Sequence, residues 1–322
     1  MPPTAAAEWL SNARQAALVV HHPAASVVRL TGDEVRRWTN GMFTNNTRRL
    51  TLGQGNRHAW CNDRGRVNGV LDLYLVAEDQ VVLVLEGVDS ASFAKQFQMY
   101  LILDDIELDD LTDVDEDGAV ALVSVCGPQT GAVLAAAGLS LPEADHQHVV
   151  VDGVRVCHRD RTGLGGADLL VPVGDLDAWM QRLTDGGARP GTPDMLDALR
   201  ILDGRAAWPV DGTDKSLVHE LRFNEDCCAF DKGCYVGQEV INRVDVRGGV
   251  QKRLTMLTLD AAPSSGAAAQ VDGKAVGTVT SITTADGTVR ALGVLRKAAW
   301  EPGTVVDVDG AGPATVVAHP RG

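Results

Sequence analysis

The chain is best understood outward from Lys232-Gly233-Cys234-Tyr235-Val236-Gly237-Gln238-Glu239. Gly233 allows the backbone to turn or to approach another segment closely. The residues from about Val236 onward suit a helix, so Cys234 is predicted at or just before a helix N-terminus, with Lys232 beside it. A helix dipole and a nearby cation both stabilise a thiolate. Such a cysteine can act as a nucleophile, a redox centre or a ligand for a soft metal.

The same residues also have plain structural interpretations. A single cysteine in an intracellular protein is commonly a small buried hydrophobic residue. Glu239 and Arg243 are four residues apart with the acid first, which is the pattern of an ordinary bridge on a helix surface. Cys227-Cys228 could join Cys234 in a thiol cluster, but the spacing matches no common cluster loop, and simple packing is the other interpretation.

The segment resembles the signature of the YgfZ family, folate-binding proteins distantly related to the T-protein of glycine cleavage, an aminomethyltransferase. The family pattern K-G-C-[FY]-x-G-Q-E, followed by three residues and Arg, is matched at every position from 232 to 243. Four other parts of the chain resemble the family: 30–33 together with 44–45, 61–66, 199–205 and 247–253. The end of the third part, Arg205-Ala206, departs mildly from the family pattern.

The resemblance implies an α+β fold in which three lobes, with mixed antiparallel sheets, form a ring around a cavity that holds tetrahydrofolate or a related folate. It implies an accessory role in iron–sulfur cluster assembly or repair, which supports transfer-RNA modification indirectly. Partners would be cluster assembly proteins and client enzymes. Cys234 with Lys232 would carry the chemistry, and Gly233, Tyr235, Gly237 and Glu239 complete the motif.

Folate sets chemical requirements of its own. Its pterin edge needs a carboxylate or carboxamide, its rings need apolar walls, and its glutamate tail needs cations. The candidate contacts are Thr44, Asn45, Asp63, Arg64, Gln238 and Arg243. Asn45 and Asp63 have a second interpretation, because such residues also stabilise turns.

Two alternative functions stay open. The T-protein carries a catalytic acidic residue in the strand after a glycine turn, and counting from Gly65 puts Gly69-Val70 at that place. Without a carboxylate there, an amine intermediate lacks its electrostatic partner, so aminomethyl transfer ranks second. Asp72 lies nearby, but the register of the strand decides where it points. The third alternative is an interaction module that binds no folate.

Hydrophobic periodicity and turn residues divide the chain into a first α+β lobe (1–118), a ferredoxin-like lobe (119–190), a return segment that carries the motif (191–250) and a small antiparallel barrel (251–322). Thr31 and Glu34 form a predicted capping box for a helix containing Trp38. The predicted strands are 26–30, 58–62, 67–77, 80–85, 119–126 and 168–173. The predicted helices are 8–17, one that Ser90 could cap and that carries Phe93, Phe97 and Leu101 at helical spacing, 131–137, 176–184 and 194–202. The pairs Asp272-Gly273, Asp286-Gly287 and Asp309-Gly310 are predicted to separate the short strands of the barrel.

Composition narrows the function classes. The net charge of −14 argues against direct nucleic-acid binding, because phosphates need clustered Lys and Arg. The acidic stretch 104–117 is expected to be a solvated edge or loop; Asp113, Asp115 and Asp117 only partly match a calcium loop. The six cysteines contain no Cys-x-x-Cys pair, and no metal is predicted. No signal peptide and no apolar run of about 18 residues is found, so we expect a cytoplasmic protein without membrane spans.

Overall fold

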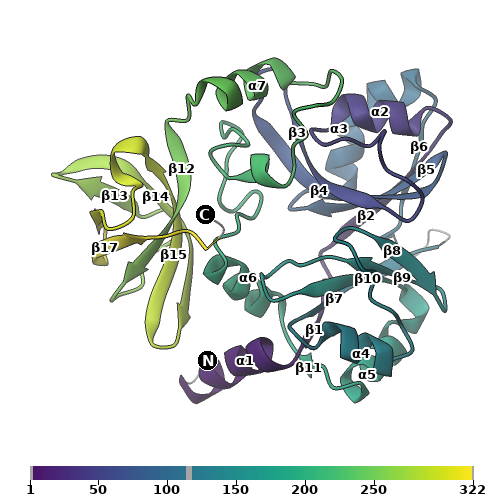
Figure 1. The fold of residues 1–322 in the computed structure, drawn as a ribbon, viewed down its shortest axis with the longest axis horizontal. Helices are drawn as coiled ribbons and strands as arrows, with labels where there is room; N and C mark the ends of the chain where they lie inside the picture. The colour runs from purple at the N-terminus through teal and green to yellow at the C-terminus, as the bar shows by residue number, and fades with distance from the viewer. Residues whose placement is uncertain (1–2, 114–117, 321–322) are drawn as a thin grey trace.

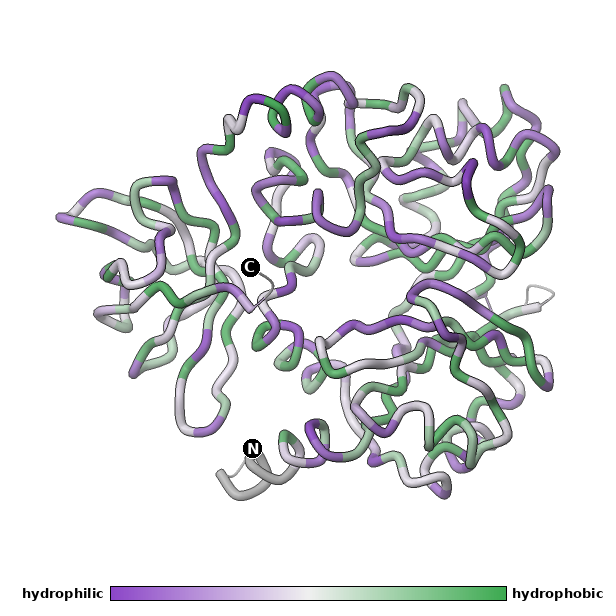
Figure 2. The backbone as a smooth tube through the Cα atoms, viewed as in Figure 1, coloured by the Kyte–Doolittle hydropathy of each residue, from purple (hydrophilic) through white to green (hydrophobic). Residues whose placement is uncertain are grey.

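Two mainly antiparallel sheets and a closed β-barrel form the three lobes of the protein (Figure 1). The computed structural model describes residues 3–113 and 118–320, so positions 115 and 117 of the suggested calcium loop lie outside the described residues. The predicted α+β fold with a C-terminal barrel is confirmed. Hydrophilic positions are frequent along the segments that face the centre between the lobes (Figure 2).

The first sheet lies under two helices, α2 (Val35–Met42) and α3 (Ser90–Leu103). Phe93, Phe97 and Leu101 recur at helical spacing along α3 and are buried against the sheet, as predicted. The strand order is β3 (Gly55–Cys61), β4 (Val67–Ala77), β5 (Gln80–Glu86), β2 (Ser26–Thr31) and β6 (Glu107–Asp110).

The start signals predicted for these two helices are wrong in detail. Thr31 is the last residue of β2, and α2 begins four residues later at Val35, so Thr31 does not cap α2; its hydroxyl accepts a hydrogen bond from Gln80 instead. Glu34 precedes α2 and forms an ion pair with Arg37 instead of a capping box. The cap of α3 is Asp89, whose side chain accepts from the backbone N of Ser92.

The second sheet stacks face to face with the first. Tyr74, Val82 and Val84 of the first sheet meet Leu122 and Leu170 of the second in one buried cluster. The outer face is covered by α4 (Thr130–Ala136) and α5 (Leu176–Asp185), with the short helix η1 (Val173–Asp175) before α5. The strand order is β11 (Arg189–Pro190), β1 (Leu18–His21), β7 (Val120–Cys126), β10 (Gly166–Pro172), β9 (Val154–His158) and β8 (His148–Val151).

The division of the chain into lobes stays a prediction, but strand pairing moves one segment across the proposed boundary. β1 pairs with β7 and β11, so residues 18–21 lie in the second sheet although they fall in the predicted first lobe. The apolar run at residues 18–20 does not reveal the partner strand, because such a run suits a buried strand in either sheet. α1 (Pro3–Gln15) and α6 (Pro193–Leu202) lie beside β1 through a shared apolar cluster.

The barrel begins at β12, directly after the predicted boundary, and closes when β17 pairs with β12. Asp272-Gly273 and Asp286-Gly287 both have positive φ at each residue, as two-residue hairpin turns require. Its strands are β12 (Lys252–Leu259), β13 (Ala268–Val271), β14 (Lys274–Ala285), β15 (Thr288–Arg296), β16 (Val305–Val308) and β17 (Gly312–Val317), with η3 (Lys297–Ala299) after β15.

The segment 203–237 connects the lobes at the centre of the ring. It is formed mostly by turns, apart from η2 (Phe223–Glu225), and leads into α7 (Gln238–Arg247). Its apolar side chains share one buried core with β4 and with the barrel; Val70, Trp208, Tyr235 and Leu254 belong to it. Among the described helices, none has the length and apolar character needed to cross a membrane.

A buried carboxylate joins the two stacked sheets. Asp72 of β4 accepts from Arg159 (Nε–Oδ2, 3.0 Å) and contacts His146 (Nε2–Oδ1, 3.0 Å), and both partners belong to the second lobe. Burial alone would raise the pKa of Asp72, but the Arg159 charge and the His146 hydrogen bond outweigh it and hold this pKa well below its usual range. The strand register therefore turns Asp72 toward the second lobe.

We predict that Asp72→Asn lowers the free energy of unfolding by about 3–5 kcal/mol, because removing one charge leaves Arg159 buried and unpaired. Chemical denaturation at pH 7 measures this. Asp231→Asn is the matched control, since Asp231 pairs with Arg49 on the surface with both side chains exposed, and it should leave the midpoint unchanged. Equal stability of Asp72→Asn and the wild type would contradict the buried pairing.

The pH dependence follows from the depressed pKa of Asp72. Its stabilising contribution is fully present above the unfolded pKa of about 3.9 and is lost as pH falls through the folded value. The difference in unfolding free energy between wild type and Asp72→Asn should therefore shrink in acid. A difference that stays constant down to the acid transition would contradict this assignment.

Candidate functional site

A cavity of about 220 Å³ lies at the centre of the ring, where α6 and the loop after it meet both sheets. This volume is below the ~300–1,000 Å³ typical of pockets that enclose a whole ligand, so the cavity has room for one end of a larger molecule. The charged residues on its wall are Arg57, Arg159, Arg161, Arg200, Arg205, Glu86 and Asp197.

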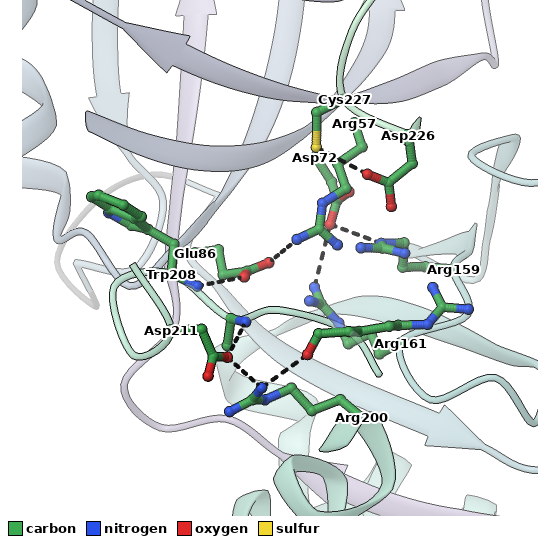
Figure 3. Close-up of polar contacts among 12 residues, drawn as sticks. Arg57, Asp72, Glu86, Arg159, Arg161, Arg200, Trp208, Asp211, Asp226 and Cys227 are labelled. Atoms are coloured by element: carbon green, nitrogen blue, oxygen red, sulfur yellow. Dashed lines mark hydrogen bonds and ion pairs between the residues drawn. The ribbon is translucent and has the colours of Figure 1, made fainter. Parts of the chain in front are cut away.

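Arg57 comes from β3 and is 7% exposed. Its Nη2 donates to Glu86 Oε2 at 2.6 Å, and Glu86 Oε1 accepts from the backbone N of Trp208 at 3.1 Å (Figure 3). Burial alone would lower the pKa of Arg57, but Glu86 and further acidic groups raise it well above the usual value. Arg57 is therefore a permanent cation held by Glu86 at one edge of its guanidinium.

Two more arginines follow β9 and approach the cavity from the second lobe. Arg161 forms a two-pronged pair with Asp168 of β10 (Nη2–Oδ2, 2.6 Å; Nε–Oδ2, 2.9 Å). It also lies 3.6 Å from Asp72, which pairs with Arg159 (Figure 3). Burial opposes both charges, yet the nearby carboxylates raise the pKa of both guanidinium groups. Each arginine is therefore oriented by a carboxylate behind it.

Arg200 ties the cavity wall to the barrel. It lies near the end of α6 and donates to Asp211 (Nη1–Oδ2, 2.7 Å) and to Ser281 of β14 (Nη2–Oγ, 2.8 Å). Asp211 also accepts from the backbone N of Ala207 at 2.9 Å. Arg200 belongs to residues 199–205, one of the stretches that resemble the family. Through the hydrogen bonds of Arg200, this stretch links α6 to the central loop and to the barrel.

Two nitrogen atoms in this wall are buried and have no hydrogen-bond partner among the described residues: Arg57 Nε and Arg159 Nη2. A buried guanidinium N–H without an acceptor costs free energy, which an incoming acceptor would recover. The carboxylate of a ligand is such an acceptor, and two-pronged binding of carboxylates is the usual role of arginine. The cavity is therefore suited to an anionic or strongly polar acceptor group.

Cys234 does not line this cavity. Its side chain is exposed and lies in a separate groove of about 380 Å³, together with Gly233 and residues of α2 such as Trp38 and Asn40. α7 begins at Gln238, so Cys234 is further from the helix N-terminus than predicted, and a helix dipole weakens beyond the first turn.

Lys232 is turned away from the cysteine. Its Nζ donates to the backbone oxygens of Asn40 (2.7 Å), Phe43 (2.7 Å) and Asn45 (2.6 Å), and it lies 4.8 Å from the ring centre of Tyr235. Burial lowers the pKa of Lys232 to about 7. Only the ammonium form has the three N–H donors needed to satisfy all three oxygens. No donor remains for the Cys234 thiol, and Lys232 is a positioning residue in this arrangement.

The close backbone approach is made by Gly237, not by Gly233. A Cβ at Gly237 would lie 2.6 Å from the oxygen of Asn62, and its φ is +83°, whereas a Cβ at Gly233 would meet nothing within 4 Å. Gly65 faces it from the turn between β3 and β4, where a Cβ would lie 3.3 Å from the oxygen of Gly237. The motif therefore docks on the first lobe through paired glycines.

The predicted folate contacts are not on the wall of the central cavity. Thr44 is fully buried; its hydroxyl accepts from the backbone N of Ala59 and lies 2.5 Å from the oxygen of Cys227, to which it can donate its single hydrogen. The Asn45 amide donates to the oxygens of Arg57 and Asp226. Both side chains hold the segment 226–228 against β3, which is a structural role but not the turn-stabilising one expected for Asn45.

The other four predicted contacts lie nearer the surface. Asp63, Arg64 and Arg243 are exposed, and Gln238 only approaches the oxygens of Lys232 and Gly233 at 3.5 and 3.4 Å. No ion pair joins Glu239 to Arg243 in the described part of the chain. The role of Asp63, Arg64, Gln238 and Arg243 as ligand contacts stays a prediction.

The buried thiols behave as packing residues. Cys227 is in the central core, and burial raises the pKa of its thiol well above the usual value. Burial raises the pKa of Cys228 to about 12. Among the described side chains, those of residues 9–113 and 118–320, no group of three or more His, Cys, Asp or Glu is arranged to hold a metal ion. A thiol cluster with Cys234 finds no support.

The place of the acidic residue expected for aminomethyl transfer is filled by apolar groups. A Cβ at Gly69 would lie 2.1 Å from the Trp60 ring, and Val70 is fully buried. Trp60 is held by a hydrogen bond from Nε1 to Gln96 (3.1 Å). A carboxylate at position 69 would require Trp60 to move.

Sequence reasoning missed the arginines of the cavity. The pair Arg159 and Arg161, just after a strand, was a usable signal, because alternate residues there point to the same side. The sequence around Arg57 did not indicate a site, since a single arginine in a strand is commonly an exposed surface residue. Their common destination depends on contacts between distant segments, since Arg159 pairs with Asp72, which is 87 residues away in the sequence.

Comparison with known proteins identifies distant relatives of the chain. No family model matches the chain. It is 26% identical over 299 residues to the "Putative transferase At1g60990, chloroplastic" of Arabidopsis thaliana, covering 87% of this chain and 66% of the relative, just under two thirds. It is 25% identical to the "tRNA-modifying protein YgfZ" of Yersinia enterocolitica, covering 84% of this chain and 82% of that protein.

The structure resembles the crystal structure of the glycine cleavage system aminomethyltransferase T from Bartonella henselae. The TM-score is 0.87 at 20% sequence identity, with 99% of this chain and 90% of that chain covered. This likeness shows the fold. Together with the sequence relatives, it supports distant homology to the wider group that contains YgfZ proteins and aminomethyltransferases.

We predict that Lys232→Met lowers the free energy of unfolding by about 1–3 kcal/mol, because it leaves buried backbone oxygens without a donor. Urea denaturation measures this. Lys215→Met is the matched control: Lys215 is exposed, and its hydrogen bonds are made by its backbone, so its stability should not change. Unchanged stability of Lys232→Met would refute the positioning role and restore Lys232 as a candidate for chemistry at Cys234.

Proposed function

We propose that this protein binds tetrahydrofolate or a related folate in the central cavity and acts as an accessory factor in iron–sulfur cluster assembly or repair. Its effect on transfer-RNA modification would be indirect, through enzymes that carry clusters. The distant YgfZ relative, named as tRNA-modifying, supports this direction. So does the net charge of −14, which disfavours direct binding of transfer RNA.

The observation that carries the folate proposal is the pair of unpartnered buried donors, Arg57 Nε and Arg159 Nη2, on a wall that also presents carboxylates. The carboxylates of a folate tail accept from guanidinium groups, and Glu86 or Asp197 can accept from the N–H groups of a pterin edge. The residues present therefore fit either polar end of a folate. A bound folate supplies a carrier for one-carbon units.

In this proposal the chain's own residues bind and orient. Arg57 and Arg159 are held by Glu86 and Asp72, so they cost little reorganisation when a ligand arrives. Cys234 lies in the separate groove and remains the candidate for exchange with partner proteins. The cavity and the thiol would then be two sites on one scaffold.

Aminomethyl transfer is the second candidate, favoured by the likeness to the Bartonella enzyme. Trp60 at Gly69 and the buried Val70 leave no carboxylate where this chemistry needs one, so we rank it lower. Incubation with tetrahydrofolate and an aminomethyl donor distinguishes the two, since the accessory role predicts no donor-dependent release of ammonia. Sustained release would reverse the ranking.

We predict that tetrahydrofolate at ~100 times its dissociation constant stabilises the wild type by about 2.7 kcal/mol, measured as a rise in melting temperature. Ala207→Trp, which places a large ring on the cavity wall without removing an ion pair, should abolish the rise. The matched control is Ala261→Trp at an exposed site of the barrel lobe. No rise in the wild type would favour a passive interaction module.

For the thiol, we predict that Cys234→Ser folds with unchanged stability, because Cys234 is exposed, yet does not restore iron–sulfur enzyme activity in cells that lack this protein. Cys126→Ser is not a suitable control because Cys126 is buried. Ser92→Ala, on the exposed first turn of α3, serves instead. Full rescue by Cys234→Ser would remove the thiol from the mechanism.

A further inference from the structure

Another cavity, of about 310 Å³, lies between the central loop and the barrel. One side of its wall is formed by residues 210–213, 215 and 216 with Glu220, and the other by β14, β15 and Lys252 at the start of β12. We call it the barrel cavity. Its volume is at the lower end of the ~300–1,000 Å³ typical of pockets that enclose a whole small molecule. It shares no lining residue with the central cavity, so it is a separate site.

Three cations line the barrel cavity: Lys215, Lys252 and Arg296. They are exposed, and none of them forms an ion pair with any residue that the structure describes. The chain has 43 acidic residues against 29 basic ones, so a cation in it has many carboxylates to pair with. Unpaired cations that converge on one cavity of so acidic a chain favour an anionic occupant.

Carboxylates near the barrel cavity do not cancel this charge. Asp211 lines the cavity, but Arg200 neutralises it at 2.7 Å. Glu220 is the other acidic residue on the wall, and its Oε2 accepts from the backbone N of Leu217 at 3.0 Å. The three cations therefore exceed the charge of Glu220 by two. The charged sequence neighbours of the wall residues are also mainly basic: Arg253, Lys274 and Lys297, against Asp214.

Two of the cations are placed against each other by the barrel sheet. Lys252 and Arg296 are partners in the antiparallel register of β12 and β15. Like charges directly opposite each other destabilise a sheet, and solvent screens only part of this repulsion at exposed positions. An anion bound between the two side chains would replace the repulsion with two attractive contacts. The pair therefore costs stability without a ligand and suits a site that binds an anion.

The turn on the other side of the cavity adds neutral donors. The Ser216 hydroxyl accepts from the backbone N of Thr213 at 3.0 Å, and the Thr213 hydroxyl accepts from the backbone N of Lys215 at 3.3 Å. Neither hydroxyl donates to another described residue, so both O–H groups are available to a ligand. Cations and hydroxyl donors together form a set that suits the oxygens of a phosphate group.

β14 is irregular where it lines the barrel cavity. Its pairing with β13 shifts at Val276, and its pairing with β15 shifts at Thr280. Both residues lie on the cavity wall. A bulge bends its strand and is frequent next to binding sites. Thr280 also donates to Asp211, so the bend is fixed to the central loop.

Part of the wall is apolar. Val210 of the central loop is 55% exposed, and Val276 and Val294 line the cavity from the barrel. A free phosphate ion would leave Val210 uncovered, whereas an organic group attached to the phosphate would cover it and gain from its burial. The wall therefore suits a ligand that has both a charged group and an apolar one.

We propose that the barrel cavity binds a small phosphate monoester. Its phosphate group contacts the three cations and accepts from the hydroxyls of Thr213 and Ser216, while its organic part packs on Val210. A phosphate monoester carries about −1.5 to −2 charges at pH 7, which matches the excess of positive charge on the wall. A phosphodiester carries a single charge and matches it less well. This site goes beyond the proposed function and does not depend on it.

The probe is phenyl phosphate, and its binding is measured by isothermal titration calorimetry at pH 7 and constant ionic strength. Methyl phenyl phosphate has the same ring but only one charge, so it should bind at least about tenfold more weakly, as expected for one lost charge-assisted contact. Inorganic phosphate should also bind more weakly, because it has no ring to cover Val210. No binding of phenyl phosphate, or equal affinity for either of the other two compounds, overturns the assignment to a monoester.

Two variants test the cations without disturbing the core. Lys252→Met and Arg296→Met should each weaken phenyl phosphate binding about tenfold. Their melting temperature without ligand should equal or exceed that of the wild type, because each change removes a like-charge neighbour. A lower melting temperature in both would refute the repulsion between Lys252 and Arg296, on which the proposal relies.

The matched control is Lys95→Met, which removes the same charge from an exposed site on α3 of the first lobe and should keep full affinity. Equal weakening in Lys95→Met would reduce the effect to net charge and overturn the site. Unchanged affinity in both Lys252→Met and Arg296→Met would also overturn it. Displacement of phenyl phosphate by a short oligonucleotide would assign the cations to nucleic acid instead and end the proposal.

The test also separates this site from the proposed folate function. Because the two cavities share no lining residue, saturating tetrahydrofolate should leave the affinity for phenyl phosphate unchanged. Competition between the two ligands would show that folate occupies the barrel cavity and would overturn the separate site. If tetrahydrofolate does not bind at all while phenyl phosphate does, the folate function fails and the barrel cavity stands.

Discussion

The buried pairing of Asp72 with Arg159 is the contact on which the centre of the molecule depends. It joins two sheets that also share an apolar cluster and the hydrogen bonds of His148 with the backbone oxygens of Gly53 and Leu75. A carboxylate in this environment is tolerated only with its partners in place, so the pair specifies one register between the lobes. That register delivers Arg159 and Arg161 to the same cavity as Arg57.

The third side of the cavity is fixed by a second buried pair. Arg200 and Asp211 connect α6 and the central loop, and both contact the hydroxyl of Ser281 in the barrel. The three lobes are thus linked at the centre by arginine–carboxylate pairs. Arginine suits this role, because one guanidinium can serve a carboxylate behind it and still present an N–H to the cavity.

The Cys234 thiol lies outside the central cavity, and this separation bears on how the two sites could work together. An enzyme that used Cys234 on a folate would bring the sulfur to the cavity wall, but the structure puts Cys234 in an exposed groove between α2 and the motif. Lys232 and the glycine contacts of Gly237 and Gly65 hold that groove in place. The arrangement favours a thiol offered to another macromolecule over a thiol offered to the bound cofactor.

Local patterns in the sequence predicted the elements well, because they depend on neighbours in the chain. The spacing of Phe93, Phe97 and Leu101 predicts α3, and the Asp-Gly pairs predict the hairpins of the barrel. The motif at 232–239 identified the distant relationship and the fold. Predictions that needed a partner from elsewhere were less successful: Thr31 as a cap, β1 in the first lobe and Lys232 beside a reactive thiol.

What the sequence by itself determined is most of the helices and strands, the barrel and the motif that carries Cys234; it did not predict β1 or β6, which pair with strands from other parts of the chain. What only the tertiary structure decided is which charges meet. Arg57, Arg159 and Arg200 lie on separate elements, and nothing in their local sequence shows that they share a cavity. The physical reason is that buried charges must find opposite charges, and those partners are brought together by the packing of whole sheets rather than by adjacent residues.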